Sequence, residues 1–208
     1  MALALTGFSV VAGGLLGWVN DVTAEPIAQA NAKTLSDAIA VVVPGFDNNP
    51  AEAPETVEVN GATYKIYKAT KNGQPIGAAV ESAANGFGGA LTVLVGFDNE
   101  GKIIDYSLLS HAETPGLGSK AADWFKKGAK GDITGKKPGE APLTVSKDGG
   151  EIDAITASTI TSRAFLLAVN NAYAAYKNQH VDGASGATQQ EKPTEEAVSD
   201  TTNVEPVK

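Results

Sequence analysis

The chain has 208 residues and carries 24 acidic against 16 basic side chains, which gives a formal net charge of −8. An acidic surface repels phosphate backbones, so we expect no nucleic-acid partner. The absence of cysteine excludes thiolate catalysis, disulfides and Cys-ligated iron–sulfur clusters. The two histidines, His111 and His180, lie far apart in the sequence, so we expect no histidine-rich metal centre.

The first predicted element is the uncharged stretch from Ala2 to Val19, which contains Trp18 near its end. An α-helix of this length spans about 27 Å, close to the hydrocarbon thickness of a bilayer. A signal peptide needs a basic n-region, which is missing here, and usually has a shorter apolar segment. The pattern therefore favours a membrane anchor over a signal peptide or a buried core helix. Because the first lysine is Lys33, the segment after the anchor is expected outside the cytoplasm.

A second helix is predicted to begin at Pro26, because proline suits the first helical position, and to end at Pro44-Gly45. The polar segment 48–55 is predicted to be a loop or linker. Alternating apolar residues then predict five strands, with turns at Asn60-Gly61, at 71–74 and at 98–101. This spacing is typical of an antiparallel meander.

The second half of the chain is predicted to be mainly helical. We expect a short helix over 119–130, a hairpin around Asp148-Gly149-Gly150 and a long helix from about Ile160 to Lys177. The fold class is therefore α+β, an antiparallel sheet packed with helices. The last twenty residues are polar, acidic and proline-containing, so they predict a disordered tail.

Hydroxyl side chains crowd the entrance of the last helix. Five of them occur within seven residues, namely Thr156, Ser158, Thr159, Thr161 and Ser162. One Ser or Thr is enough to cap a helix and contributes about 1 kcal/mol. A helix N-terminus also attracts anions, because its N–H groups are free and its dipole is positive there. The residues by themselves are consistent with ordinary capping and with a phosphate site.

The segment 153–162, DAITASTITS, resembles the D-x-x-[ST]-G-A-T-x-T-S segment of the FMN-binding subunits of the Rnf and Na⁺-pumping NADH:quinone reductase complexes. In that family a flavin transferase joins FMN, through its phosphate, to the final Thr of [ST]-G-A-T. This position corresponds to Thr159. Asp153 and Thr156 match the pattern, whereas Ala157 replaces the usual Gly and Ser158 replaces Ala.

A second segment, HAETPGLG over 111–118, resembles the H-x-E-T-P-G-L-G segment of the same family. Pro115 and Gly116 favour a turn, and Gly118 permits a close backbone approach. A flat ring that lies against such a loop would meet backbone amides and the Thr114 hydroxyl. The resemblance covers about residues 20–178, and the length fits the G subunit of the Rnf complex better than the longer C subunit of the quinone reductase.

The resemblance implies a set of cofactor-binding residues. They are Thr159 as the site of a covalent FMN phosphoester, with Asp153, Thr156, Ser158, Thr161, His111, Glu113, Thr114, Gly116, Leu117 and Gly118. Glu113 is expected to orient the loop or to contact the flavin. Arg163, one turn into the last helix, is expected to pair with the phosphate or with Asp153.

A second copy of the attachment pattern lies near the end of the chain. The segment 182–188, DGASGAT, fits D-x-x-[ST]-G-A-T more closely than the first copy does. It lacks the helix and the TSRA continuation that follow Thr159. It is either a small-residue linker or a second attachment site at Thr188, and Thr159 is the preferred site.

The resemblance implies an electron-carrier protein within a larger complex. We expect a transmembrane anchor over 1–20, an extracytoplasmic FMN-binding domain over 21–180 and a flexible acidic tail over 181–208, in the cytoplasmic (inner) membrane. The expected partners are the lipid bilayer, a flavin transferase and the other membrane subunits of an Rnf-type complex, which couples ferredoxin:NAD⁺ oxidoreduction to Na⁺ or H⁺ translocation. The alternatives are the C subunit of the quinone reductase, an independent extracytoplasmic FMN reductase and a non-redox anchored adhesion module.

Overall fold

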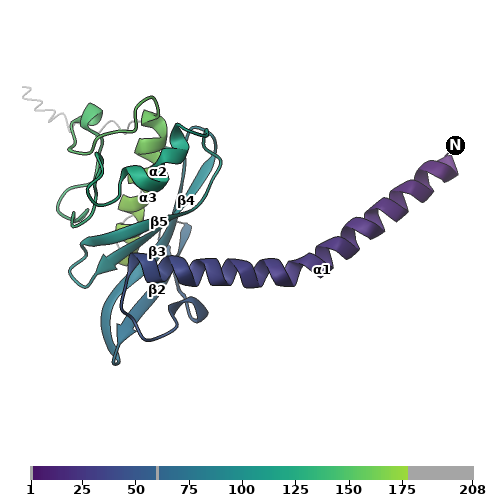
Figure 1. Ribbon diagram of the computed structural model, residues 1–208, viewed down its shortest axis with the longest axis horizontal. Helices are drawn as coiled ribbons and strands as arrows, with labels where there is room; N and C mark the ends of the chain where they lie inside the picture. The colour runs from purple at the N-terminus through teal and green to yellow at the C-terminus, as the bar shows by residue number, and fades with distance from the viewer. Residues whose placement is uncertain (1, 60, 178–208) are drawn as a thin grey trace, which may run out of the picture.

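The computed structural model describes residues 2–59 and 61–177, except for the side chains of residues 2–5, 7, 8 and 28. A long helix projects from a domain in which one sheet lies between helices (Figure 1). In chain order, with η for a 3-10 helix, the elements are α1 (Ala2–Val42), η1 (Pro50–Glu52), β1 (Glu55–Val59), β2 (Ala62–Lys71), β3 (Gln74–Asn85), β4 (Ala90–Asp98), β5 (Ile103–His111), η2 (Gly118–Lys120), α2 (Ala121–Trp124), η3 (Ser146–Asp148) and α3 (Thr159–Tyr176).

The sheet is the predicted antiparallel meander, with strand order β1-β2-β3-β4-β5. Val59 pairs with Ala62, and Lys71 pairs with Gln74, so both tight hairpins fall where the turn residues predicted them. Asn72 and Gly73 have positive φ values of 52° and 74°, the backbone conformation that a two-residue hairpin turn requires. The α+β class and the five-stranded sheet are therefore confirmed.

Each face of the sheet packs against a different helix. On one face, α3 and the segment around α2 bury a cluster that includes Phe97, Tyr106 and Phe165. On the other face, the C-terminal part of α1 buries Ile39 and Val42 against the sheet. The interior strand β4 is buried on both faces of the sheet, because neighbouring residues of a strand point to opposite faces and both faces are covered by helices. The sheet thereby holds the end of α1 and the whole of α3 in fixed positions.

Gly96 of β4 allows α1 to approach the sheet closely. A Cβ atom at this position would lie 2.0 Å from the main-chain oxygen of Val42, closer than real contacts allow. A larger residue would push the end of α1 away from the strand.

The helix predicted from Pro26 does not begin there. Pro26 lies inside α1, which is continuous from Ala2 to Val42 and bends along its length (Figure 1). A proline inside a helix removes one hydrogen bond and crowds the preceding turn, and a long helix accommodates it by bending. The expected boundary between regions at residue 20 therefore falls within one helix. Among the described residues, no helix combines the length and apolar character needed to cross a membrane.

Two further predictions in the second half differ from the structure. The short helix expected over 119–130 is present but ends earlier: η2 and α2 cover Gly118–Trp124, and Phe125, with φ −103° and ψ 8°, is the C-cap of α2. The hairpin expected around 148–150 is absent: Val145 and Ile152 form a parallel bridge around η3 instead. The glycines there allow a compact loop rather than two antiparallel strands.

Candidate functional site

Three segments that are distant in sequence meet at the side chain of Glu113. This residue follows β5 and is only 5% exposed. Its Oε1 accepts the N–H of Phe87 at 2.9 Å, and its Oε2 accepts the N–H of Gly88 at 3.3 Å. The same Oε2 accepts the hydroxyl of Thr161, in the first turn of α3, at 2.9 Å. One carboxylate therefore joins the β3–β4 loop, the loop after β5 and the entrance of α3.

Glycines make room for this carboxylate. A Cβ at Gly86 would lie 1.9 Å from Glu113 Oε1, and a Cβ at Gly118 would lie 2.6 Å from Oε2. The Gly118 position would also bring a Cβ within 2.9 Å of Thr161 Oγ1. The close approach expected at Gly118 is therefore made to the buried carboxylate and to the helix that it holds.

The hydroxyl groups at the entrance of α3 have different hydrogen-bond partners. Ser162 Oγ accepts the N–H of Ile155 at 2.9 Å and donates to the main-chain oxygen of Ser158 at 3.0 Å. The Thr161 hydroxyl donates to the Glu113 carboxylate. Ser158 stands at the N-cap of α3 and is buried, but it makes no side-chain capping bond. Capping therefore does not explain why hydroxyl groups gather at this helix.

Thr159 is the first residue of α3, and its side chain is partly exposed. Lys147, on η3, donates from Nζ to Thr159 Oγ1 at 3.2 Å. The first turn of α3 contains no acidic residue of its own, and the carboxylate of Glu113 contacts this turn from the buried side, through Thr161. An anion joined to or bound beside Thr159 would therefore be stabilised by the helix end.

Ala157, two residues before α3, has a φ of 62°. This left-handed conformation costs an alanine about 1–2 kcal/mol, whereas glycine adopts it freely. The glycine that the resembling family usually has at this position fits this backbone without strain.

We expect Ala157→Gly to raise the free energy of unfolding by about 1 kcal/mol, because it relieves this strain. For a domain of this size the melting temperature would rise by about 2–4 °C. The matched control is Asn72→Gly, because Asn72 also has positive φ but asparagine tolerates it better. A rise for Asn72→Gly that equals or exceeds the rise for Ala157→Gly would contradict this interpretation.

The loop after β5 forms the turn that the sequence predicted. The main-chain oxygen of Thr114 accepts the N–H groups of Leu117 and Ser119, each at 3.2 Å. Gly116 has a φ of 75°, and its N–H donates to Ser119 Oγ at 2.9 Å. His111 is exposed, and its Nδ1 accepts the N–H of Glu113 at 3.2 Å. The loop is thus held by its own hydrogen bonds.

Two large apolar side chains remain exposed at this end of the molecule. Phe87 is 70% exposed although its main-chain N–H is bonded to Glu113, and Leu117 is 40% exposed. Phe87 was not among the predicted site residues. The sequence contained only a weak signal for it, an aromatic residue within a glycine-rich segment, because its exposure depends on the fold.

Asp153 and Thr156 are exposed beside the entrance of α3. The main-chain oxygen of Asp153 accepts the indole N–H of Trp124 at 2.8 Å. Arg163 does not pair with Asp153: its Nε and Nη2 donate to the two oxygens of Asp148 at 2.6 and 2.5 Å. These hydrogen bonds raise the pKa of the Arg163 guanidinium above its ordinary value. The fold brings η3 to this face of α3, so Asp148 is the nearer carboxylate.

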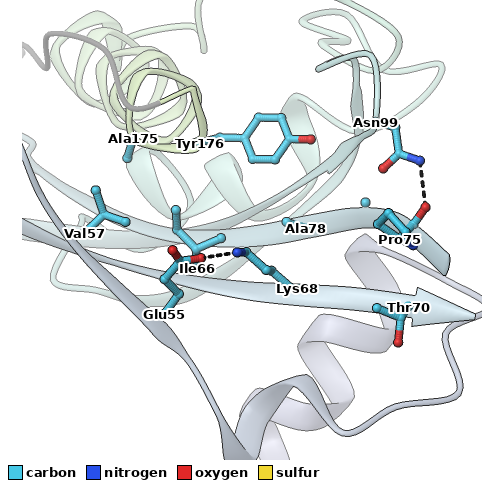
Figure 2. A pocket seen from close by; sticks show the side chains of 11 residues that line it. Glu55, Val57, Ile66, Lys68, Thr70, Pro75, Ala78, Asn99, Ala175 and Tyr176 are labelled. Carbon is cyan, nitrogen blue, oxygen red and sulfur yellow. Dashed lines mark hydrogen bonds and ion pairs between the residues drawn. The ribbon is translucent and has the colours of Figure 1, made fainter. Parts of the chain in front are cut away.

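The pocket shown in Figure 2 is not part of this site. It has a volume of about 340 Å³ and lies between β1–β3 and the C-terminal turn of α3, where Tyr176 lines it (Figure 2). Glu55 and Lys68 form an ion pair on its floor. None of the predicted cofactor-binding residues lines it.

The described part of the chain holds no group of three or more His, Asp or Glu side chains arranged for a metal ion. The entrance of α3 instead presents a hydroxyl, a lysine ammonium, a helix N-terminus without an acidic residue in its first turn and, on the neighbouring loops, exposed apolar side chains. This combination suits a ligand with a phosphate group and a flat apolar ring. The second attachment pattern, with Thr188, lies outside the described residues.

Comparisons with known proteins give a consistent result. Residues 86–174 match the family model described as FMN-binding domain, a segment that contains Phe87, Glu113 and Thr159. The G subunit of the ion-translocating oxidoreductase complex of Yersinia pestis is 36% identical over 181 residues, which cover 82% of this chain and 86% of that protein. The corresponding G subunit of Vibrio cholerae serotype O1 (strain M66-2) is 35% identical over 189 residues, which cover 86% and 89%.

A solved structure is also similar to this chain. It is the C subunit of the Na⁺-translocating NADH-quinone reductase from Parabacteroides distasonis, which has a TM-score of 0.47 and 19% sequence identity. The similarity covers 78% of this chain and 94% of that one.

Proposed function

Because the chain belongs to the family of G subunits of ion-translocating oxidoreductase complexes, we propose that it carries FMN as a phosphoester on Thr159 and relays electrons between the membrane subunits of such a complex. The observation that carries this proposal is the placement of Thr159 Oγ1, a partly exposed hydroxyl on the first residue of α3, with the Lys147 ammonium group 3.2 Å away.

The residues of the site fit this cofactor. Thr159 provides the oxygen for the ester, and the N-terminus of α3 stabilises the charge that a phosphodiester retains. Exposed Phe87 and Leu117 offer apolar contact for a flat ring, beside a loop whose turn includes Thr114. The bound FMN supplies oxidation–reduction chemistry, and the protein supplies position and surroundings. An acid–base catalytic pair is not needed for electron relay.

A covalent bond at Thr159 serves a carrier in two ways. It prevents the cofactor from diffusing away on the extracytoplasmic side, where we place the domain. It also keeps the ring at a high effective concentration near its redox partners. A flavin transferase is required to form the ester, and we count it as a partner during maturation.

The N-terminal part of α1 supports membrane attachment. It projects from the domain (Figure 1), and it exposes a series of large apolar side chains. They are Val10, Val11, Leu15, Leu16, Trp18 and Val19. We propose that residues 1–20 form a single-pass anchor in the cytoplasmic membrane and dock against lipid and the other subunits. Ferredoxin:NAD⁺ oxidoreduction coupled to Na⁺ or H⁺ translocation is the proposed activity of the complex.

Two alternatives predict different behaviour. The relatives with 34–36% identity are G subunits, which favours this family over the C subunit of the Na⁺-pumping quinone reductase. An independent FMN reductase would turn over an acceptor when purified alone, whereas a relay protein would do so only within its complex.

The test is the intact mass of the chain extracted from native membranes of cells that contain the flavin transferase. We expect the polypeptide mass plus FMN minus one water. Peptide mapping is expected to place the added mass on Thr159. A spectrum that contains only the bare polypeptide would refute covalent attachment, and an added mass found only on Thr188 would refute the assignment to Thr159.

A further inference from the structure

Lys147 reaches the candidate attachment hydroxyl from a different part of the chain. It lies on η3, 12 residues before Thr159, and its Nζ is 3.2 Å from Thr159 Oγ1. An ammonium group forms its strongest hydrogen bonds with ionised acceptors, and a neutral hydroxyl is a weak substitute. The contact therefore places a cation where an anionic group on Thr159 would lie.

The backbone around Lys147 is held in place by contacts of the neighbouring residues. Asp148, the next residue, receives two hydrogen bonds from Arg163, one turn into α3, at 2.6 and 2.5 Å. The loop is closed at its base by the Val145–Ile152 bridge, with Ser146 N donating to Ile152 O at 2.8 Å. These contacts hold η3 against the first turns of α3. They also occupy the Nε and Nη2 donors of Arg163, so Lys147 is the better-placed cation for a group on Thr159.

We propose that Lys147 is a positioning residue for the flavin phosphate: its ammonium group pairs with the non-bridging oxygens of the phosphodiester on Thr159. The Arg163–Asp148 pair holds η3, which carries Lys147, against α3. This inference rests on the proposed covalent attachment at Thr159. Esterification makes Oγ1 a poorer acceptor and adds a negatively charged phosphate one bond beyond it. The ammonium group then moves from the hydroxyl oxygen to the phosphate and keeps the cofactor's attached end in one orientation.

The test uses the full chain produced together with the flavin transferase. Lys147→Met removes the charge but keeps the apolar stem, and Lys147→Arg keeps the charge. The matched control is Lys68→Met, which removes an exposed, ion-paired lysine near the C-terminal end of α3. Two readouts are compared: the fraction of chains that carry the FMN mass at early times, and the ³¹P NMR resonance of the phosphodiester in fully loaded protein.

We expect Lys147→Met to lower the labelling rate about fivefold, which is the effect of losing one partly exposed charge pair. We also expect it to move the ³¹P resonance. Lys147→Arg should restore most of the labelling rate and most of the ³¹P shift. Lys68→Met should match the wild type in both measurements. Equal melting temperatures of the unlabelled proteins would show that the fold is intact.

The outcomes separate this inference from the proposed function. If wild type carries FMN on Thr159 and Lys147→Met leaves the ³¹P resonance unchanged, the pairing is refuted, whatever happens to the labelling rate. If wild type carries no FMN, or carries it elsewhere than on Thr159, the proposed function itself fails. A shifted resonance that the arginine variant restores supports the phosphate contact.

Discussion

Thr159→Ala is expected to abolish the flavin fluorescence that remains with the chain after denaturation and electrophoresis. The substitution removes the only oxygen through which the proposed ester is formed. Thr159 Oγ1 is partly exposed and contacts Lys147, so its loss should change the free energy of unfolding by less than about 1 kcal/mol. The loss of signal would therefore reflect chemistry rather than unfolding. The measurement is in-gel fluorescence, normalised to stained protein.

Three further variants act as controls for this prediction. Thr159→Ser keeps a hydroxyl at the same position and should retain much of the signal. Thr156→Ala removes an exposed hydroxyl that lies before the helix and should leave the covalent signal in place. Thr188→Ala removes the second pattern and should also leave it in place. Undiminished fluorescence in Thr159→Ala, combined with loss in Thr188→Ala, would move the attachment to the second pattern.

Glu113→Ala is expected to destabilise the protein more than any other single truncation at this site. It leaves the part-buried N–H groups of Phe87 and Gly88 and the buried hydroxyl of Thr161 without their acceptor. An unsatisfied buried polar group costs about 1–3 kcal/mol and a part-buried one costs less, so the total should be about 3 kcal/mol. For a domain of this size the melting temperature would fall by about 6–12 °C, as measured by circular dichroism.

The interpretation of Glu113 can be separated from a general effect of charge removal. Glu113→Gln keeps one acceptor oxygen and should cost clearly less than Glu113→Ala. Glu100→Ala removes an exposed glutamate that forms an ion pair with Lys102 and should change the melting temperature little. A Glu113→Ala protein that melts within about 2 °C of wild type would refute the role of this carboxylate in joining the three segments. Direct contact between Glu113 and the flavin stays a separate prediction.

Several parts of the fold could be predicted because their signals are local. Alternation of apolar residues, together with turn residues such as Asn72-Gly73, places β1 to β5, since the side chains of a strand alternate with period two. The apolar stripe of the last helix predicted α3 to within one residue at each end. The continuation of α1 through Pro26 was missed, because a proline is compatible with both a helix start and a helix bend.

The sequence by itself determined the meander, the last helix, α3, and the two segments whose resemblance identifies the family, because each depends on residues that are neighbours in the chain. Only the tertiary structure decided which side chains meet at the site. Glu113 and Thr161 are 48 residues apart, Phe87 and Glu113 are 26 apart, and Lys147 reaches Thr159 across 12. No local pattern predicts such pairs, because they come together only when the sheet fixes the entrance of α3 beside the loops after β3 and β5 and beside η3.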